Sequence, residues 1–119
     1  MNVAVLGASD KEDRFSYKAL KLLQEKGHKV FPVHQRIKTI DGQAVYRSIT
    51  DIKEPIDTVT LYVAADISTA LAEDISSLHP RRIIFNPGAE NPALVQKAKE
   101  KGVETVENCT LVMARTGLF

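Results

Sequence analysis

The chain has 119 residues, which is the size of one domain, and 44% of them are hydrophobic, enough for a core of its own. Its 16 basic and 15 acidic residues leave a net charge of +1, so charge indicates neither a nucleic-acid partner nor an anionic membrane. No apolar run is long enough for a membrane span, and no signal peptide is recognisable. Cys109 is the single cysteine. It fits a reducing compartment, and we expect a cytoplasmic protein.

Strand-like and helix-like segments alternate along most of the chain. Runs of apolar or β-branched residues predict five strands, at residues 3–6, 29–33, 58–63, 82–85 and 103–106. Apolar residues at helical spacing and helix-start signals predict four helices, at residues 16–26, 66–78, 91–101 and 110–115. We expect Ser16 to cap the first helix and Asp66 or Ser68 to cap the second.

This alternation predicts an α/β fold. We expect a Rossmann-like, doubly wound parallel sheet of about five strands, with helices on both faces, in a single domain over residues 1–119. Residues 34–52 are predicted to be irregular, with a tight turn at Asp41-Gly42 and one helical turn around residues 48–52. In such sheets, ligands bind beyond the carboxyl ends of the strands, where the strand order reverses.

The loop after the first predicted strand reads Gly7-Ala8-Ser9. Backbone N–H groups at the start of a helix can bind a phosphate, to which Ser9 would add a hydroxyl and Arg14 a guanidinium. One glycine is weaker evidence than a G-x-G-x-x-G ladder. The same residues also fit a plain strand-to-helix turn in which Ser9 is a local cap.

After the second predicted strand, cations stand where an NAD site has an acid. Asp or Glu at this position holds the ribose hydroxyls of NAD, but here Val33 is followed by His34, Arg36 and Lys38. These cations suit a ribose that carries a phosphate, as in NADP or coenzyme A. The alternative is a solvated basic loop with His34 on the surface.

The other loops contain no recognisable catalytic set. Gly88 in Asn86-Pro87-Gly88 would let a ligand approach the backbone, although a simple tight turn explains it equally well. Cys109 has no base or cation nearby in the sequence to activate it, so a small buried residue is the simpler interpretation. The three histidines are too scattered for a metal motif.

Several short stretches together resemble the small CoA-binding protein family, a stand-alone Rossmann domain similar to the amino-terminal domain of the succinyl-CoA synthetase α-subunit. They follow the family's order over nearly the whole chain: VLGAS (5–9), RFS (14–16), VFPVHQ (30–35), IDG (40–42), YRSITDI (46–52), LYV (61–63), FNPGAEN (85–91) and ENCTLV (107–112). The family often has Val-Asn-Pro where this chain has Val33-His34-Gln35. The synthetase also has a second domain with a phosphorylated histidine, so the resemblance does not extend to ligase activity.

The resemblance implies a coenzyme A (CoA) ligand laid across the carboxyl ends of the strands. The pyrophosphate would be held by Gly7, Ala8, Ser9 and Arg14. The adenosine and its 3′-phosphate would lie by Val33, His34, Arg36 and Lys38. The adenine or ribose would be walled by Val63 and Ala64, and the pantetheine path would be lined by Asn86, Pro87 and Gly88.

Three functions fit these residues. Non-catalytic binding of CoA or an acyl-CoA explains the cations and the missing catalytic set. A small NADP-dependent reductase explains the cations, but so short a chain leaves little room for a substrate and a proton donor. An interaction domain with a decayed nucleotide site fits the single glycine. We expect a small nucleotide ligand and no nucleic-acid or membrane partner, and a homodimer or an unknown partner protein is left open.

Overall fold

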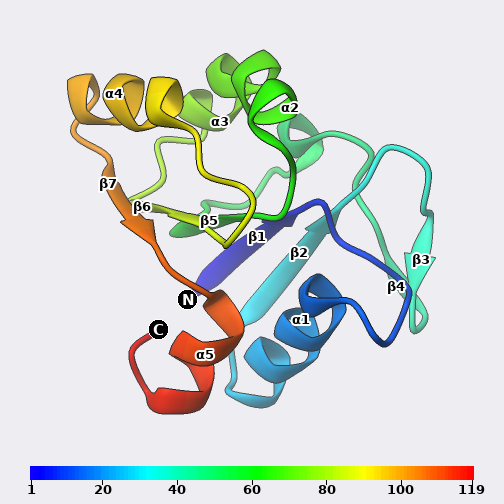
Figure 1. Ribbon diagram of the computed structural model, residues 1–119. Coiled ribbons are helices and arrows are strands. Elements are labelled where there is room, and N and C mark those ends of the chain that lie inside the picture. The colour runs from blue at the N-terminus through cyan, green and yellow to red at the C-terminus, as the bar shows by residue number, and fades with distance from the viewer.

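The computed structural model describes residues 1–119 as an open parallel sheet with helices on both sides (Figure 1). Its strands are β1 (Asn2–Leu6), β2 (Lys29–Val33), β5 (Thr58–Leu61), β6 (Arg82–Phe85) and β7 (Glu104–Glu107). They lie in the order β2-β1-β5-β6-β7, and every pairing is parallel. The doubly wound α/β fold predicted from the sequence is confirmed.

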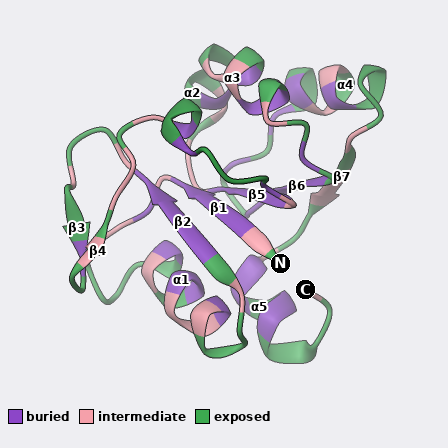
Figure 2. Cartoon of the chain, turned by 180° about the vertical axis from the view of Figure 1, so that it is seen from behind, coloured by how far each residue is buried: buried purple, intermediate pink, exposed green.

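Except for the edge strand β7, the sheet is buried on both faces, which explains the apolar runs of β1, β2 and β6 (Figure 2). In β1, Ala4 and Leu6 belong to one core cluster, while Val3 and Val5 belong to the other, as the alternation of side chains along a strand requires. One face is covered by α2 (Ala65–Ala70), α3 (Ala72–Ser77) and α4 (Pro92–Glu100). The other face is covered by α1 (Phe15–Glu25) and α5 (Thr110–Thr116).

Two predicted helix caps are wrong. Ser16 lies inside the first turn of α1, where its side chain is buried and caps nothing. α2 begins before Asp66 and Ser68, so neither residue is its cap. Ser68 is also buried, and its hydroxyl accepts a hydrogen bond from Asn91 Nδ2 at 2.7 Å. A contact between two helices therefore uses a side chain that local rules would place at a helix start.

The region after β5 also differs from prediction. The strand predicted over residues 58–63 ends at Leu61, after which the chain turns toward α2. The helix predicted over residues 66–78 is interrupted at Leu71, whose φ of −99° and ψ of 7° separate α2 from α3. Leu71 packs against the core beneath both helices, a tertiary contact that helix spacing alone does not reveal.

The predicted irregular segment contains a small hairpin, β3 (Thr39–Ile40) and β4 (Gln43–Ala44), followed by the 3₁₀ turn η1 (Ile49–Asp51). Asp41 and Gly42 turn the hairpin with φ of 48° and 79°, which confirms the predicted tight turn. The segment protects the outer edge of β2, because Tyr46 N–H donates to Pro32 O at 2.9 Å. Proline itself leaves no unpaired N–H at that edge.

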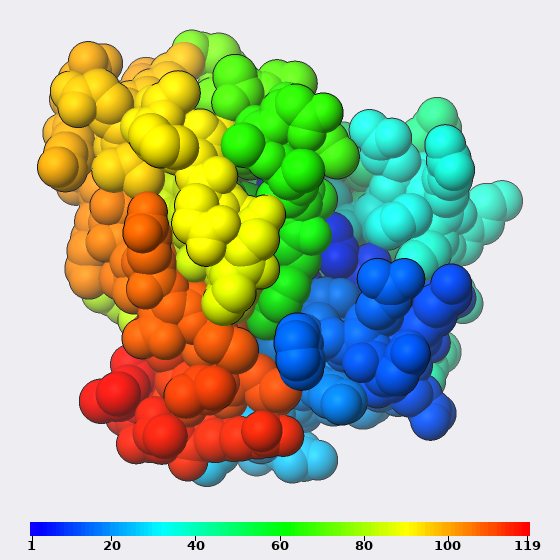
Figure 3. Space-filling view, in the orientation of Figure 1, coloured from blue at the N-terminus to red at the C-terminus, as the bar shows by residue number.

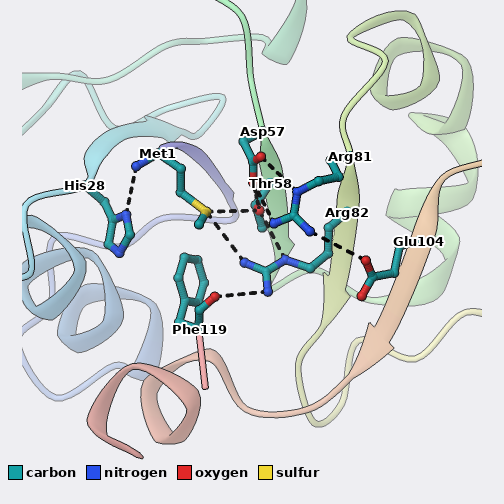
Figure 4. Close-up of polar contacts among 8 residues, drawn as sticks. All are labelled: Met1, His28, Asp57, Thr58, Arg81, Arg82, Glu104 and Phe119. Atoms are coloured by element: carbon teal, nitrogen blue, oxygen red, sulfur yellow. Dashed lines mark hydrogen bonds and ion pairs between the residues drawn. The ribbon is translucent and has the colours of Figure 1, made fainter. Parts of the chain in front are cut away.

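The amino ends of the strands are joined by polar contacts (Figure 4). The Asp57 carboxylate accepts hydrogen bonds from Arg81 Nε at 3.0 Å and Nη2 at 3.2 Å. Arg82 is buried, donates to Thr58 Oγ1 at 3.2 Å, and lies with its guanidinium over the Phe119 ring. These contacts hold β5, β6 and the segment after α5 together at the end of the sheet opposite the candidate site.

Acid is expected to destabilise the protein partly through Asp57. The hydrogen bonds from Arg81 hold the pKa of this carboxyl below its ordinary value of 3.8, so the folded state binds fewer protons than the unfolded state. The resulting stabilisation is present above the unfolded pKa and is lost as pH falls through the lower folded pKa. When the pH is lowered from about 5 to about 3, Asp57→Asn should therefore lose less stability than the wild type. Urea unfolding measures this loss. Exposed Asp10→Asn is the control, and equal pH slopes in all three proteins would contradict the assignment.

Candidate ligand-binding site

The strand order reverses between β1 and β5, which are neighbours in the sheet but lead to helices on opposite faces (Figure 1). The two loops that follow them diverge and leave an opening, which is where doubly wound proteins bind ligands. A cavity of about 340 Å³ lies at this point. In Figure 3, blue, cyan and green segments meet around this recess.

The cavity has an apolar interior and a polar rim. The apolar side chains in its lining are those of Leu6, Val33, Ile49, Val63, Ile67 and Leu71. Its polar side chains all come from two segments after β2, and they are His34, Gln35, Arg36, Arg47 and Ser48. Neither arginine forms an ion pair, whereas the ion pairs of the protein lie elsewhere. The site therefore combines an apolar surface with uncompensated positive charge.

Gly7 is required by the close approach of two loops. Its φ is 90°, and an added Cβ would lie 2.9 Å from Val63 Cγ1 and 3.0 Å from Tyr62 O. The N–H groups of Gly7 and Ala8 both donate to Val33 O, at 3.1 and 3.2 Å. These two N–H groups are therefore engaged inside the protein, and a phosphate contact from this loop has to come from the residues that follow.

The start of α1 offers such donors. The N–H groups in the first turn of a helix have no intrahelical acceptor. In α1, whose N-cap residue is Arg14, no side chain caps them. Ser9 lies just before, and its hydroxyl oxygen accepts from Lys11 N–H at 3.1 Å while its own proton stays free to donate. Arg14 is exposed. Ser9 and Arg14 thus lie at or just before the start of α1 and outside the cavity lining, while Ala8 is buried and faces the core.

His34 shapes the loop after β2. Its ring Nδ1 accepts hydrogen bonds from the N–H groups of Arg36 at 3.0 Å and Ile37 at 3.1 Å. An asparagine side chain makes the same kind of turn, so histidine serves here where the family often has asparagine. The turn presents Arg36 to the cavity. Lys38, in contrast, is exposed outside the cavity lining, near the start of the hairpin.

Arg47 is the cation that sequence reasoning missed. Tyr46 pairs with β2 as an isolated parallel bridge to Val33, and His34 N–H donates to Tyr46 O at 2.9 Å. This bridge brings the next residue, Arg47, to the same cavity as Arg36, 11 positions away in the sequence. The only signal in the sequence was the YRSITDI stretch itself, which does not show which strand it joins.

The remaining predicted residues divide between the cavity wall and the scaffold. Val63 lines the cavity, whereas Ala64 is exposed and is the N-cap residue of α2. Asn86 is buried, and its amide is fully used: Nδ2 donates to Thr60 Oγ1 at 2.7 Å and Leu61 O at 2.8 Å, and Oδ1 accepts from Thr110 N–H at 2.8 Å. It therefore joins β5, β6 and α5.

Pro87 and Gly88 follow Asn86 as an exposed turn outside the cavity. A second hollow, of about 480 Å³, runs along the outer edge of β2. Its charged side chains Lys29 and Glu54 pair with each other at 2.5 Å, so it lacks the uncompensated charge of the first cavity. No group of three metal-ligating side chains gathers in the protein, and none of its helices has the length and apolar character needed to cross a bilayer.

Comparison with known proteins identifies the family. A family described as CoA binding domain matches residues 1–115. The chain belongs to this CoA-binding domain family. The resemblance drawn from the sequence is thus confirmed.

The relatives of this CoA-binding domain include both small and large proteins. It is 28% identical over 112 residues to the uncharacterized protein YneT of Bacillus subtilis (strain 168), covering 94% of this chain and 83% of that protein. A stretch of 62 residues is 34% identical to the acetate–CoA ligase (ADP-forming) II subunit alpha of Pyrococcus furiosus. That stretch covers 51% of this chain but only 14% of the ligase subunit.

Solved structures share the fold of this chain. A crystal structure of an uncharacterized protein is 37% identical with a TM-score of 0.93, covering 99% of this chain and 97% of that chain. A hypothetical protein from Pyrococcus horikoshii OT3 is 28% identical with a TM-score of 0.90, covering 98% and 82%.

Proposed function

We propose that this protein binds CoA or an acyl-CoA at the carboxyl ends of the strands without catalysing a reaction on it. The observation that carries the proposal is the pair of arginines, Arg36 and Arg47, at the rim of the apolar cavity, both free of acidic partners. A guanidinium binds phosphate oxygens through paired N–H donors. Two of them beside an apolar pocket suit an adenosine that carries a phosphate on its ribose.

The adenosine would occupy the cavity. Val33 and Val63 form opposite parts of its wall, and Ile67 at α2 is 45% exposed. Covering so exposed an apolar side chain with an adenine ring is favourable. The 3′-phosphate would lie between Arg36 and Arg47, with His34 holding the loop that carries Arg36.

The pyrophosphate would lie at the start of α1. The uncapped first turn, the Ser9 hydroxyl and the exposed Arg14 are the donors there. The pantetheine would then run outward past Ala64 and the exposed Pro87-Gly88 turn. Asn86 would support that turn from below rather than touch the ligand, because its amide is already engaged.

One tyrosine–lysine pair has the spacing of a reductase proton donor, but the contacts of both residues argue against that role. Tyr17 and Lys21 stand in a Tyr-x-x-x-Lys arrangement on α1, but both contact Asp41. The hydrogen bond to this carboxylate raises the pKa of Tyr17 to about 12, the wrong direction for a proton donor that has to ionise near neutral pH. A decayed site is disfavoured by the open, positively charged cavity.

The test is calorimetric titration of the purified protein with CoA, dephospho-CoA, NADPH and NADH in parallel. We expect micromolar binding of CoA and weaker binding of dephospho-CoA, which lacks the 3′-phosphate. Tighter binding of NADPH than of CoA would favour the reductase. Absence of binding to all four ligands, with a folded protein by circular dichroism, would favour the decayed site.

Removing either arginine should weaken CoA selectively. Arg36→Ala and Arg47→Ala are each expected to reduce CoA affinity by roughly tenfold, the equivalent of one charged hydrogen bond, and to leave dephospho-CoA nearly unchanged. Lys38→Ala should have a smaller effect, because Lys38 lies outside the cavity. Arg115→Ala, an exposed cation on α5, is the control. Equal losses of affinity for CoA and for dephospho-CoA would mean that these arginines do not contact the ribose phosphate.

A further inference from the structure

Three cations of the protein lie on one segment, residues 34–47, which we call the arm. It carries Arg36, Lys38 and Arg47 and contains the β3–β4 hairpin. The base of the arm is fixed to β2, because Tyr46 N–H donates to Pro32 O and Tyr46 O accepts from His34 N–H, both at 2.9 Å. Arg36 and Arg47 lie beside this base, and the β3–β4 hairpin that joins them extends from it to the tip of the arm.

The tip of the arm is tied to α1 by one carboxylate. Tyr17 Oη donates to Asp41 Oδ2 at 2.5 Å, and Lys21 Nζ lies 3.1 Å from the same oxygen. Asp41 occupies the hairpin turn with φ of 48°, so its backbone direction is restricted and its side chain is aimed at the helix. The contact involves the carboxylate, the phenol and the ammonium group only.

Apolar packing and a glutamine pair support the same arrangement. Ile40, next to the turn, is 2% exposed and belongs to the core cluster that contains Leu20 of α1. Gln24 Nε2 donates to Gln43 Oε1 at 2.6 Å, and Gln43 Nε2 donates to Val30 O at 2.8 Å. The hairpin is therefore anchored at several points, and the carboxylate contact is the one that holds its tip.

Tyr17 also connects the two ends of the candidate site. It lies in the first turn of α1, the turn whose N–H groups have no intrahelical acceptor. Through Asp41, that turn is joined to the arm that carries Arg36 and Arg47. A ligand with phosphates at both places would meet donors whose relative positions are already set, which reduces the ordering cost of binding.

We propose that Tyr17 and Asp41 are positioning residues that hold the arm so that its arginines recognise the ribose phosphate of the ligand. This inference rests on the proposed function. The phenol and the carboxylate touch no ligand themselves. They limit the positions that the arm takes in the free protein, and the arginines then bind the phosphate at a lower entropic cost.

The experiment measures CoA and dephospho-CoA binding by Tyr17→Phe and Asp41→Asn. Tyr17→Phe removes only the hydroxyl, and asparagine tolerates the positive φ of the turn. For both variants we expect CoA affinity to fall about three- to tenfold, and dephospho-CoA affinity to change less than about twofold. Glu73→Gln, which breaks the exposed ion pair with Lys97 away from the arm, is the matched control and should change neither affinity.

Hydrogen exchange separates positioning from folding. The Val45 N–H, which donates to Lys38 O at 3.0 Å inside the arm, should exchange faster in both variants, while amides of β1 stay as protected as in the wild type. If the wild type distinguishes the two ligands and the variants distinguish them equally well, Tyr17 and Asp41 are not positioning residues. If the wild type binds neither ligand, the proposed function fails first and this inference fails with it.

Discussion

Asn86→Ala is expected to lower the free energy of unfolding by about 3 kcal/mol, because three buried hydrogen bonds depend on this amide. The change would leave the Thr110 N–H at the start of α5 without its partner, and the Leu61 carbonyl would keep only the backbone N–H of residue 86, at 3.4 Å. It would also remove the donor to Thr60 Oγ1, which would keep only its contact with Thr110 Oγ1. A buried polar group left unpaired costs the full loss of its hydration.

Urea unfolding at neutral pH measures the effect. Asn108→Ala is the control, since Asn108 is exposed and its side chain accepts only from the adjacent Cys109 N–H. Its loss should stay below about 1 kcal/mol. A comparable effect for both asparagines would show that the Asn86 amide does not hold the strands and α5 together. If Asn86 instead lay on the pantetheine path, as the resemblance implied, CoA affinity would fall without a loss of stability.

Gly7→Ala is the other change with a large expected effect, again about 3 kcal/mol. The positive φ of 90° disfavours any side chain, and the new Cβ would meet Tyr62 O at 3.0 Å, a backbone atom that cannot move alone. The loop after β5 would have to shift away from β1. Because Val63 in that loop lines the cavity, CoA affinity should fall together with stability.

Gly88 offers a matched comparison. Its φ is 91°, almost the same as that of Gly7, but nothing lies within 4 Å of a Cβ added there. Gly88→Ala should therefore cost only the backbone term, about 1 kcal/mol. The double variant Gly7→Ala/Val63→Ala should recover part of the Gly7→Ala loss, because one of the two close contacts is with Val63 Cγ1 at 2.9 Å. Equal losses of stability in Gly7→Ala and Gly88→Ala would mean that the loops after β1 and β5 can move apart at no cost.

The strands and the fold class were predictable because burial on both faces of a parallel sheet demands runs such as VAVL in β1 and RIIF in β6. The start of α4 was predictable for a local reason, since Asn91 accepts from Leu94 N–H within a single turn. The same local rule predicted caps at Ser16 and at Asp66 or Ser68, but none of these residues caps a helix. Packing buries Ser16 and Ser68, and a distant asparagine uses the Ser68 hydroxyl.

For the candidate site, the sequence indicated which loops carry candidate residues but not where their side chains point. Gly7, Val33, His34, Arg36 and Val63 all line the cavity. Asn86 lies in the predicted loop, yet its amide faces the core.

By itself, the sequence determined the order of strands and helices, the doubly wound class and the loops where a ligand would bind, because these follow from periodicity and from the rules of parallel sheets. Only the tertiary structure decided which cations converge. Arg47 reaches Arg36 through the Tyr46 bridge to β2, and Asp41 reaches Tyr17 through the hairpin turn. Both contacts join segments far apart in the chain, and their geometry depends on the packing of the whole domain rather than on any local pattern.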